Sequence, residues 1–220
     1  MGDGPWIAVA GPRPNYVKLA PLVRAAAERG RELQWIDTGQ HTARVMRSAM
    51  ITDLALPEPV ATLRAPKTRR IERMADSLGR ELAARKPSLV VVVGDVDSTL
   101  AAALAAWRLD LPLAHVEAGL RSYERGMPEE RNRVLVDSIS DRLYLSEPQA
   151  QENLAREGVA SARIRKSGNV MADALRALWP RIEAAAEPWA ARWGLGGFVV
   201  ATLHRQANVD NPQRLAGYAR

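Results

Sequence analysis

Cysteine is absent from this chain of 220 residues, and long apolar runs are absent as well. Without cysteine there are no disulfide bonds, no thiol catalysis and no thiolate metal ligands, which fits a reducing compartment. No stretch approaches the ~20 apolar residues that span a membrane, and the opening segment MGDGPWIAVAG lacks the basic region and long apolar core of a signal peptide. We therefore expect a cytoplasmic protein with no membrane partner.

Several motifs of cofactor and nucleophile chemistry are also missing. The chain has neither the G-x-G-x-x-G fingerprint of dinucleotide binding nor the G-x-S-x-G nucleophile elbow. It has no H-x-x-x-H or D-x-D-x-D-G pattern, and Asp95 with Asp97 is a thin basis for Mg²⁺. The sequence therefore predicts no metal site and no dinucleotide cofactor.

The residues that are present suit a globular protein of one large domain, or of one and a half ordinary ones. Lys and Arg outnumber Asp and Glu by 31 to 25, and the densest basic stretch is Leu63 to Met74, LRAPKTRRIERM. This stretch is either a solvated loop that enters a helix or a surface that steers phosphate. It has no aromatic residue of the kind that nucleic-acid modules interleave with their charge, so we expect no nucleic-acid partner.

Hydrophobic periodicity predicts alternating strands and helices. The predicted strands are 6–10, 33–36, 89–93, 112–116, 142–145 and 164–166, and the predicted helices are 18–29, 70–85, 99–108, 129–140, 149–157 and 170–178. The run LVVVV at 89–93 shows no polar alternation, as expected for a parallel strand covered on both faces. The pattern predicts an α/β protein with a Rossmann-like, doubly wound parallel sheet.

Composition changes towards the end of the chain. Residues 179–197 gather prolines, tryptophans and glycines, which predicts a connection between domains. We expect an N-terminal Rossmann-like domain over 1–170, a crossover over 171–197, and over 198–220 the first strand and helix start of a second, truncated Rossmann-like domain. The last strand, Phe198 to Leu203, ends in His204-Arg205.

Acidic residues follow two neighbouring predicted strands. Asp95 comes directly after Gly94, and Glu117 comes directly after His115-Val116. Ligands of such sheets lie beyond the carboxyl ends of the strands, where a carboxyl group can carry a proton. Pro128-Glu129-Glu130 predicts a helix start in which one glutamate complements the helix dipole. The other glutamate is not needed for that role.

Other polar groups fall at the same predicted edge. Arg13 and Lys18 belong to a loop and helix start that favour an anion, although a structural Gly-Pro turn is the alternative. In the segment 37–41, a helix cap and a solvated histidine are the alternative to a site, and Asp97 or Ser98 is expected to cap a helix. Arg121, Arg131 and Arg133 either bind phosphate or pair with the nearby acids.

Seven segments occur in a fixed order: GPRPNYVKLAP, DTGQH, VVVGDVDSTLA, HVEAGLRS, MPEERNRVLVD, SGNVMAD and ATLHRQANVD. Together they resemble the UDP-N-acetylglucosamine 2-epimerase family over nearly the whole chain. The resemblance implies the GT-B architecture, in which two Rossmann-like domains hold the substrate in the cleft between them. It also implies a homodimer and a reaction that needs neither metal nor NAD.

The resemblance further implies a reaction that inverts C2 of a UDP-2-acetamido sugar by eliminating UDP to a 2-acetamidoglucal and adding it back. The family's carboxylates correspond to Asp95, Glu117 and Glu129, two of which would donate and accept protons on opposite faces of the ring. The corresponding histidine, His204, would act with Arg13, Lys18 and Arg133 on the UDP phosphates. The remaining expected substrate contacts are Gln40, His41, Arg121 and Arg205, with Gln40 and His41 touching sugar or a regulatory nucleotide.

The chain departs from the family pattern at three positions and in length. Pro12 and Asn15 replace a threonine and a glutamate of the first loop, and Asp97 adds a carboxylate beside Asp95, so the substrate could be a relative of UDP-GlcNAc. Because the second domain supplies most UDP contacts in the family, we expect the 220 residues alone to be weak or inactive. The alternatives are a hydrolysing epimerase that releases ManNAc and UDP, a GT-B glycosyltransferase, which the paired acids argue against, and a non-catalytic nucleotide-sugar binding module.

Overall fold

A computed structural model describes residues 4–40, 44–64, 66, 68, 70–194, 196, 201–203 and 206–218. Its described part contains a seven-stranded sheet of order β3-β2-β1-β4-β5-β6-β7, in which every pairing is parallel. The strands are β1 (Trp6–Ala10), β2 (Leu33–Asp37), β3 (Ala61–Thr62), β4 (Leu89–Val93), β5 (Leu113–Val116), β6 (Arg142–Leu145) and β7 (Ile164–Lys166). The predicted fold class, a Rossmann-like α/β sheet, is confirmed.

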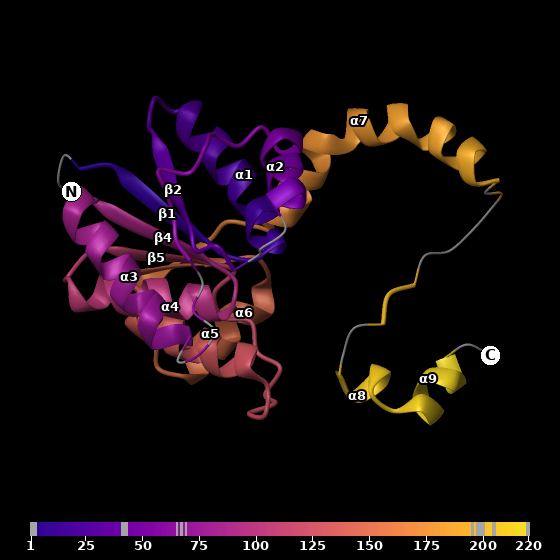
Figure 1. The fold of residues 1–220 in the computed structure, drawn as a ribbon. Coiled ribbons are helices and arrows are strands. Elements are labelled where there is room, and N and C mark those ends of the chain that lie inside the picture. The colour runs from indigo at the N-terminus through magenta and orange to yellow at the C-terminus, as the bar shows by residue number, and fades with distance from the viewer. Residues whose placement is uncertain are drawn as a thin grey trace. The chain divides into compact units, whose positions relative to one another are not determined.

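Helices cover both faces of this sheet (Figure 1). Helices α1 and α2 lie on one face, and α3, α4 and α5 lie on the other. The helices of the main unit are α1 (Arg13–Ala27), α2 (Arg44–Asp53), α3 (Arg70–Arg85), α4 (Asp97–Arg108), α5 (Pro128–Ile139) and α6 (Pro148–Arg156), with the start of α7 (Val170–Trp193). A short 3-10 helix, Ser161–Arg163, precedes β7.

Alternate strand residues point to opposite faces, so the sheet separates two cores. Ile7 and Val9 belong to the core that packs against α3 and α4, whereas Ala8 and Ala10 belong to the core beneath α1. Because both faces are covered, neither set can be polar. This double coverage explains why the central strands read as unbroken apolar runs.

Small side chains give α4 its central place. Five of its alanines have no more than 1% of their surface exposed: Ala101, Ala102, Ala103, Ala105 and Ala106. Alanine is the best helix former and its methyl group keeps neighbouring backbones close. Helix α4 therefore fits between α3, α5 and the sheet, and its first turn comes close to the ends of the central strands.

Element bounds agree with the predictions to within one residue for the six predicted strands of the main unit and for α3, α5 and α6, whereas α1 and α4 begin earlier than predicted. Helix α1 begins five residues before the predicted start, because Pro14 suits a first helical turn. The periodicity did not predict α2 or the two-residue β3. Helix α7 continues through Pro180 and Pro188 to Trp193, so the predicted end at Leu178 is wrong; the alanines and charged residues between the prolines are good helix formers.

The chain divides into two units, Met1–Leu178 and Trp179–Arg220. In the described part of the second unit no residue is buried, and it contains the end of α7, α8 (Gln206–Val209) and α9 (Pro212–Tyr218). Most of the strand predicted at 198–203 lies outside the described residues, and the described residues 201–203 are not in a strand. No described helix is both long and apolar enough to cross a membrane.

Candidate functional site

The ends of β1, β4 and β5 form the centre of one sheet edge. These strands are parallel neighbours, with Val9 aligned to Val92 and Val93 aligned to Val116. The residues that follow them therefore meet at the same edge. They are Gly11, Gly94 and Glu117.

Glu117 is held at the end of β5 in an uncommon conformation. Its φ is +67°, in the left-handed region, which costs a residue with a side chain on the order of 1 kcal/mol or more. Its side chain is 10% exposed and forms an ion pair with Lys18 of α1. The turn aims this carboxylate across the sheet edge towards α1.

Asp95 forms the second acid–base pair of the edge. Its carboxylate makes an ion pair with Arg133 of α5, and the two side chains are 23% and 12% exposed. Asn132 donates its amide N–H to the Asp95 carbonyl at 3.0 Å and to the Asp97 carboxylate at 3.3 Å. Helix α5 thus holds both the backbone and the side chain of Asp95.

The loops at this edge touch one another. A Cβ atom added to Gly11 would lie 2.2 Å from Ser98 Oγ and 2.5 Å from Gln40 Oε1. One added to Gly94, whose φ is +71°, would lie 3.0 Å from Lys18 Nζ and 3.6 Å from the Glu117 carboxylate. A side chain at position 11 would therefore displace Ser98 and Gln40, whereas at Gly94 the left-handed backbone is what favours glycine.

Several buried polar atoms near the edge have no hydrogen-bond partner among the described residues. They include Thr38 Oγ1, Gln40 Oε1 and Arg133 Nε. Buried polar atoms are normally paired, so atoms of this kind mark a place where a ligand or water completes the hydrogen bonding. Asp37 is engaged differently, since its carboxylate accepts the Gly39 N–H at 2.9 Å and pairs with Arg47 at 2.5 Å.

A buried ionic network lies behind Glu117. Asp137 of α5 accepts the Gly119 N–H at 3.0 Å and pairs with His115 at 2.7 Å and with Arg121 at 2.8 Å. Burial alone would raise the pKa of Asp137, but hydrogen bonds and charge from His115 and Arg121 outweigh burial and hold that pKa below its usual range. Asp137 therefore stays ionised and ties the loop after β5 to α5.

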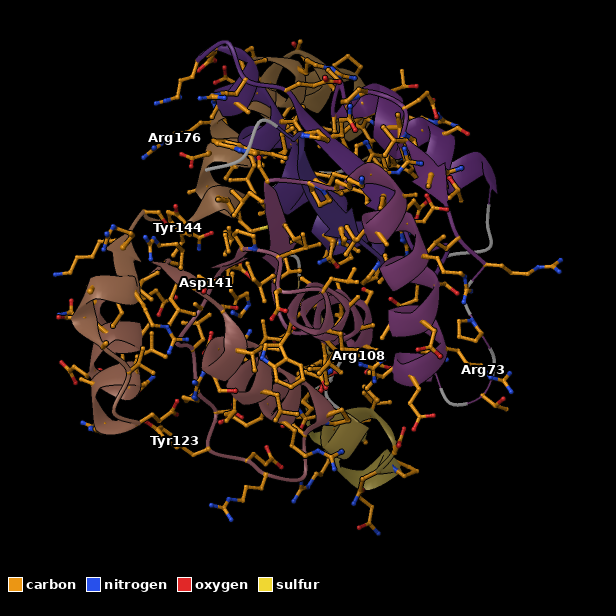
Figure 2. All side chains as sticks on the ribbon, turned by 90° about the vertical axis from the view of Figure 1, so that its left-hand side faces the viewer. Arg73, Arg108, Tyr123, Asp141, Tyr144 and Arg176 are labelled. Atoms are coloured by element: carbon orange, nitrogen blue, oxygen red, sulfur yellow. The ribbon has the colours of Figure 1, made fainter. Side chains whose placement is uncertain are left out.

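The same loop is fixed again by Glu130. Its carboxylate accepts the backbone N–H groups of Ser122 at 2.8 Å and Tyr123 at 3.0 Å. Burial opposes ionisation, but these hydrogen bonds and the charge of Arg121 lower the pKa of Glu130. Figure 2 shows Tyr123 in the loop between β5 and α5, where its hydroxyl donates to Asn153 of α6 at 2.6 Å.

The structure brings four predicted site residues together in two ion pairs at one edge: Lys18, Asp95, Glu117 and Arg133. Arg13 lies exposed in the first turn of α1, Glu129 lies exposed in the first turn of α5, and Gln40 lies beside Gly11. His41, His204 and Arg205 lie outside the described residues. For Arg121, the structure shows the ion-pairing alternative, with a side chain 1% exposed between Asp137 and Glu157.

The predicted helix caps are wrong. The N-cap of α4 is Val96, and Asp97 and Ser98 lie within the first turn instead. Asp37 and Thr38 do not cap α2, which begins at Arg44. These polar side chains instead make contacts at the sheet edge. Sequence spacing alone does not predict such contacts.

Sequence reasoning assigned no role to three buried polar residues that shape the edge. Asn15 donates to the Val93 carbonyl at 2.8 Å, Asn132 holds Asp95, and His115 contacts the Gly94 carbonyl at 2.8 Å. The available signal was a polar residue on the inner face of an otherwise apolar element. Of the basic stretch, Arg64, Arg70 and Arg73 are exposed, and Figure 2 shows Arg73 at the periphery.

Fold and edge together define the class: a Rossmann-like α/β protein in which two ion pairs lie at the carboxyl ends of the central strands. The sequence profile of the family described as UDP-N-acetylglucosamine 2-epimerase matches residues 24–220. The chain belongs to this family.

Two curated relatives illustrate the range of the family. The chain is 37% identical over 216 residues to UDP-N-acetylglucosamine 2-epimerase of Methanocaldococcus jannaschii, covering 94% of this chain and 58% of that protein. It is also 37% identical over 220 residues to UDP-2,3-diacetamido-2,3-dideoxy-D-glucuronate 2-epimerase of Pseudomonas aeruginosa, covering 95% of this chain and 60% of that one. The chain thus spans roughly three fifths of the length of these relatives.

Solved structures agree with the sequence comparison. The M. jannaschii UDP-GlcNAc 2-epimerase in complex with UDP-GlcNAc and UDP matches with a TM-score of 0.88 at 36% identity, over 97% of this chain and 60% of that one. The Neisseria meningitidis enzyme bound to UDP-GlcNAc matches with a TM-score of 0.80 at 26% identity, over 87% of this chain and 54% of that one. The Rossmann-like sheet of this chain thus matches that of solved UDP-GlcNAc 2-epimerases.

Proposed function

We propose that this chain carries the N-terminal part of the site of a non-hydrolysing UDP-N-acetylglucosamine 2-epimerase, which interconverts UDP-GlcNAc and UDP-ManNAc. The observation that carries the proposal is the pair of carboxylates, Asp95 and Glu117, at the ends of neighbouring parallel strands. Each is paired with a cation. Two acids at one edge provide a proton donor and a proton acceptor within reach of one sugar ring.

The chemistry explains why acids and cations occur together. The C2–H of the sugar has no adjacent carbonyl, so it becomes acidic only as the C1–O bond breaks and positive charge develops at C1. One carboxylate takes the C2 proton, and the electron pair of the C1–O bond leaves with UDP. A second carboxyl group then protonates C2 from the other face, and UDP adds back at C1.

The cations at the edge are suited to the leaving diphosphate. Lys18 and Arg133 already neutralise carboxylates, and Arg13 lies in the first turn of α1, where free N–H groups favour an anion. We propose that the diphosphate takes over Lys18 or Arg133, which releases a carboxylate for proton transfer. Gln40 adds an unsatisfied buried acceptor for a sugar hydroxyl.

Glu129, His41, His204 and Arg205 stay part of the proposed site on the family resemblance alone. The identity of the substrate is likewise proposed from the family resemblance. The relative named as a diacetamido-glucuronate epimerase shows that 37% identity spans more than one UDP-sugar. Asp97, which lies beside Asp95 and 3.9 Å from Arg70, is the position at which we expect substrate preference to differ.

Following the purified chain with UDP-GlcNAc by NMR tests the proposal. We expect slow formation of UDP-ManNAc, because the chain spans only three fifths of its relatives, and we expect calorimetry to detect weak UDP binding. Glu117→Gln should abolish the conversion, whereas Asp76→Asn, which alters an exposed ion pair with Arg108, should not. Free ManNAc as product would identify the hydrolysing alternative, and UDP binding without conversion would identify a binding module. If the chain neither bound UDP nor converted UDP-GlcNAc, the proposal would be contradicted.

We also propose that the protein acts in the cytoplasm as a homodimer. Helices α4 and α5 leave three large apolar side chains exposed, namely Trp107, Val134 and Leu135, at 59%, 39% and 51% of their surface. Contiguous exposed apolar surface is typical of subunit contacts, and we infer that these side chains contribute to one. Light scattering should give twice the mass of one chain, and Trp107→Glu should give a monomer; a monomeric parent chain would contradict the proposal.

A further inference from the structure

His115 is buried in the centre of β5 with no exposed surface. Its Nδ1 lies 2.7 Å from the Asp137 carboxylate, and its Nε2 lies 2.8 Å from the Gly94 carbonyl oxygen. Both distances are those of good hydrogen bonds. The ring therefore joins α5 to the loop at the end of β4.

Counting donors decides which ring nitrogen must carry a hydrogen. A backbone carbonyl oxygen only accepts hydrogen bonds, so the nitrogen that faces the Gly94 carbonyl at 2.8 Å, Nε2, must donate. The other nitrogen, Nδ1, faces the Asp137 carboxylate at 2.7 Å. The two partners together fix the orientation of the ring.

The Asp137 partner of the ring is itself held in a buried ionic network. Arg121 lies 2.8 Å from the Asp137 carboxylate and 2.7 Å from the Glu157 carboxylate. Glu130, on the same helix as Asp137, adds a carboxylate near Arg121. A buried charge that is paired and hydrogen-bonded in this way can be kept.

The Gly94 peptide is held from two sides. Its N–H donates to the Val116 carbonyl at 3.0 Å, and its carbonyl receives the His115 Nε2–H. Asp95 follows immediately, and Glu117 follows His115 by two residues. One ring thus sets the distance between the strand ends that carry the two acids.

We propose that His115 is a positioning residue whose ring, held by Asp137, donates to the Gly94 carbonyl and so fixes the loop that presents Asp95. The proposal rests on the proposed function only where it makes Asp95 a reacting group. The ring itself lies beneath the edge and needs no contact with substrate.

Nitrogen NMR of the imidazole rings tests the position of this hydrogen directly. We expect Nε2 of His115 to carry a hydrogen, because it faces the Gly94 carbonyl. The signal is assigned by its loss in His115→Gln. A His115 ring whose Nε2 carries no hydrogen would overturn the clamp.

Amide hydrogen exchange tests the clamp. His115→Phe keeps a ring but removes the donor to the Gly94 carbonyl, so the loop should open more often and exchange at the Gly94 N–H should become about fivefold faster, the effect of one lost hydrogen bond. His115→Gln retains an N–H for the carbonyl and should recover part of the protection. The matched control is Trp35→Phe, which removes another buried ring donor to a carbonyl, that of Pro57 at 2.8 Å, and should leave Gly94 unchanged.

Unchanged Gly94 exchange in a folded His115→Phe variant would overturn the clamp. If that variant does not fold, the ring nitrogens of the parent chain and the Gln variant still decide the question. None of these measurements uses a UDP-sugar. Failure of the clamp is therefore distinguished from failure of the proposed epimerase activity, which is measured by conversion alone.

Discussion

At the residue scale, Asp137 connects more parts of the structure than its position within a helix suggests. It is the single acceptor that joins His115, Arg121 and the Gly119 N–H. A buried charge of this kind stabilises little as an isolated pair, but removing one partner leaves the others uncompensated. The loop that holds Glu117 depends on it.

Asp137→Asn should therefore lower the free energy of unfolding by about 3 to 5 kcal/mol, because the buried Arg121 loses a counter-charge and His115 loses its carboxylate partner. Urea unfolding followed by circular dichroism measures the loss. Asp76→Asn, in an exposed pair with Arg108, is the matched control and should change stability by less than about 1 kcal/mol. Equal effects for the two variants would show that the network is energetically idle.

Stability should also depend on acid through these carboxylates. Asp137 and Glu130 have pKa values lowered from ordinary values of 3.8 and 4.5. A lowered pKa in the folded chain stabilises above the ordinary value and loses that stabilisation as pH falls through the lowered one. The free energy of unfolding should thus decline below about pH 4.5, and Glu130→Gln should make the decline shallower; a rise in stability between pH 5 and pH 3 would contradict this account.

At the scale of elements, the loop after β5 and helix α6 approach too closely for a side chain. A Cβ atom added to Gly119, whose φ is +78°, would lie 2.6 Å from the Ala150 carbonyl oxygen. Backbone atoms cannot yield as a flexible side chain does. The contact is therefore set by glycine alone.

Gly119→Ala should destabilise the chain by roughly 2 to 3 kcal/mol through this clash and the left-handed backbone. Gly79→Ala is the matched control, since Gly79 lies within α3 and an added Cβ meets nothing within 4 Å. There alanine should stabilise by about 0.5 to 1 kcal/mol. Thermal unfolding of both variants checks the opposite signs, and a neutral Gly119→Ala would contradict the close approach.

Elements were predictable where periodicity or punctuation was strong. The strand Leu89–Val93 and the helix Arg70–Arg85 follow from an apolar run and from helical spacing stopped by Lys86-Pro87. The two-residue β3 carries no such signal. The end of α7 was missed because prolines usually stop helices, and here they do not.

For the site, strand-end logic was enough to bring Asp95 and Glu117 to one edge. It did not reveal which cation pairs with each acid, because Lys18 and Arg133 belong to helices that are distant in sequence from Glu117 and Asp95. Nor did it distinguish Glu130, which anchors a loop by accepting backbone N–H groups, from its exposed neighbour Glu129. Such choices depend on packing between elements.

At the scale of the whole molecule, the two units differ in how far burial protects their backbone amides from exchange with solvent. Strands β1, β4 and β5 are buried on both faces, whereas no described residue of the second unit is buried. Amide exchange follows such differences, since exposed helices open locally at little cost. In exchange measured by mass spectrometry, peptides from these strands should stay protected for hours, and those from 206–218 should exchange within minutes. Comparable protection in both would contradict the difference.

The contact among Gly11, Gln40 and Ser98 joins two loops and the first turn of α4, which are distant in sequence. Because a methyl group at position 11 would collide with both side chains, a larger residue there requires the residues at 40 and 98 to move or to be smaller. Related sequences should show the effect of this contact. Among homologous chains, we expect positions 11, 40 and 98 to covary, so that a larger residue at one is accompanied by a smaller residue at another.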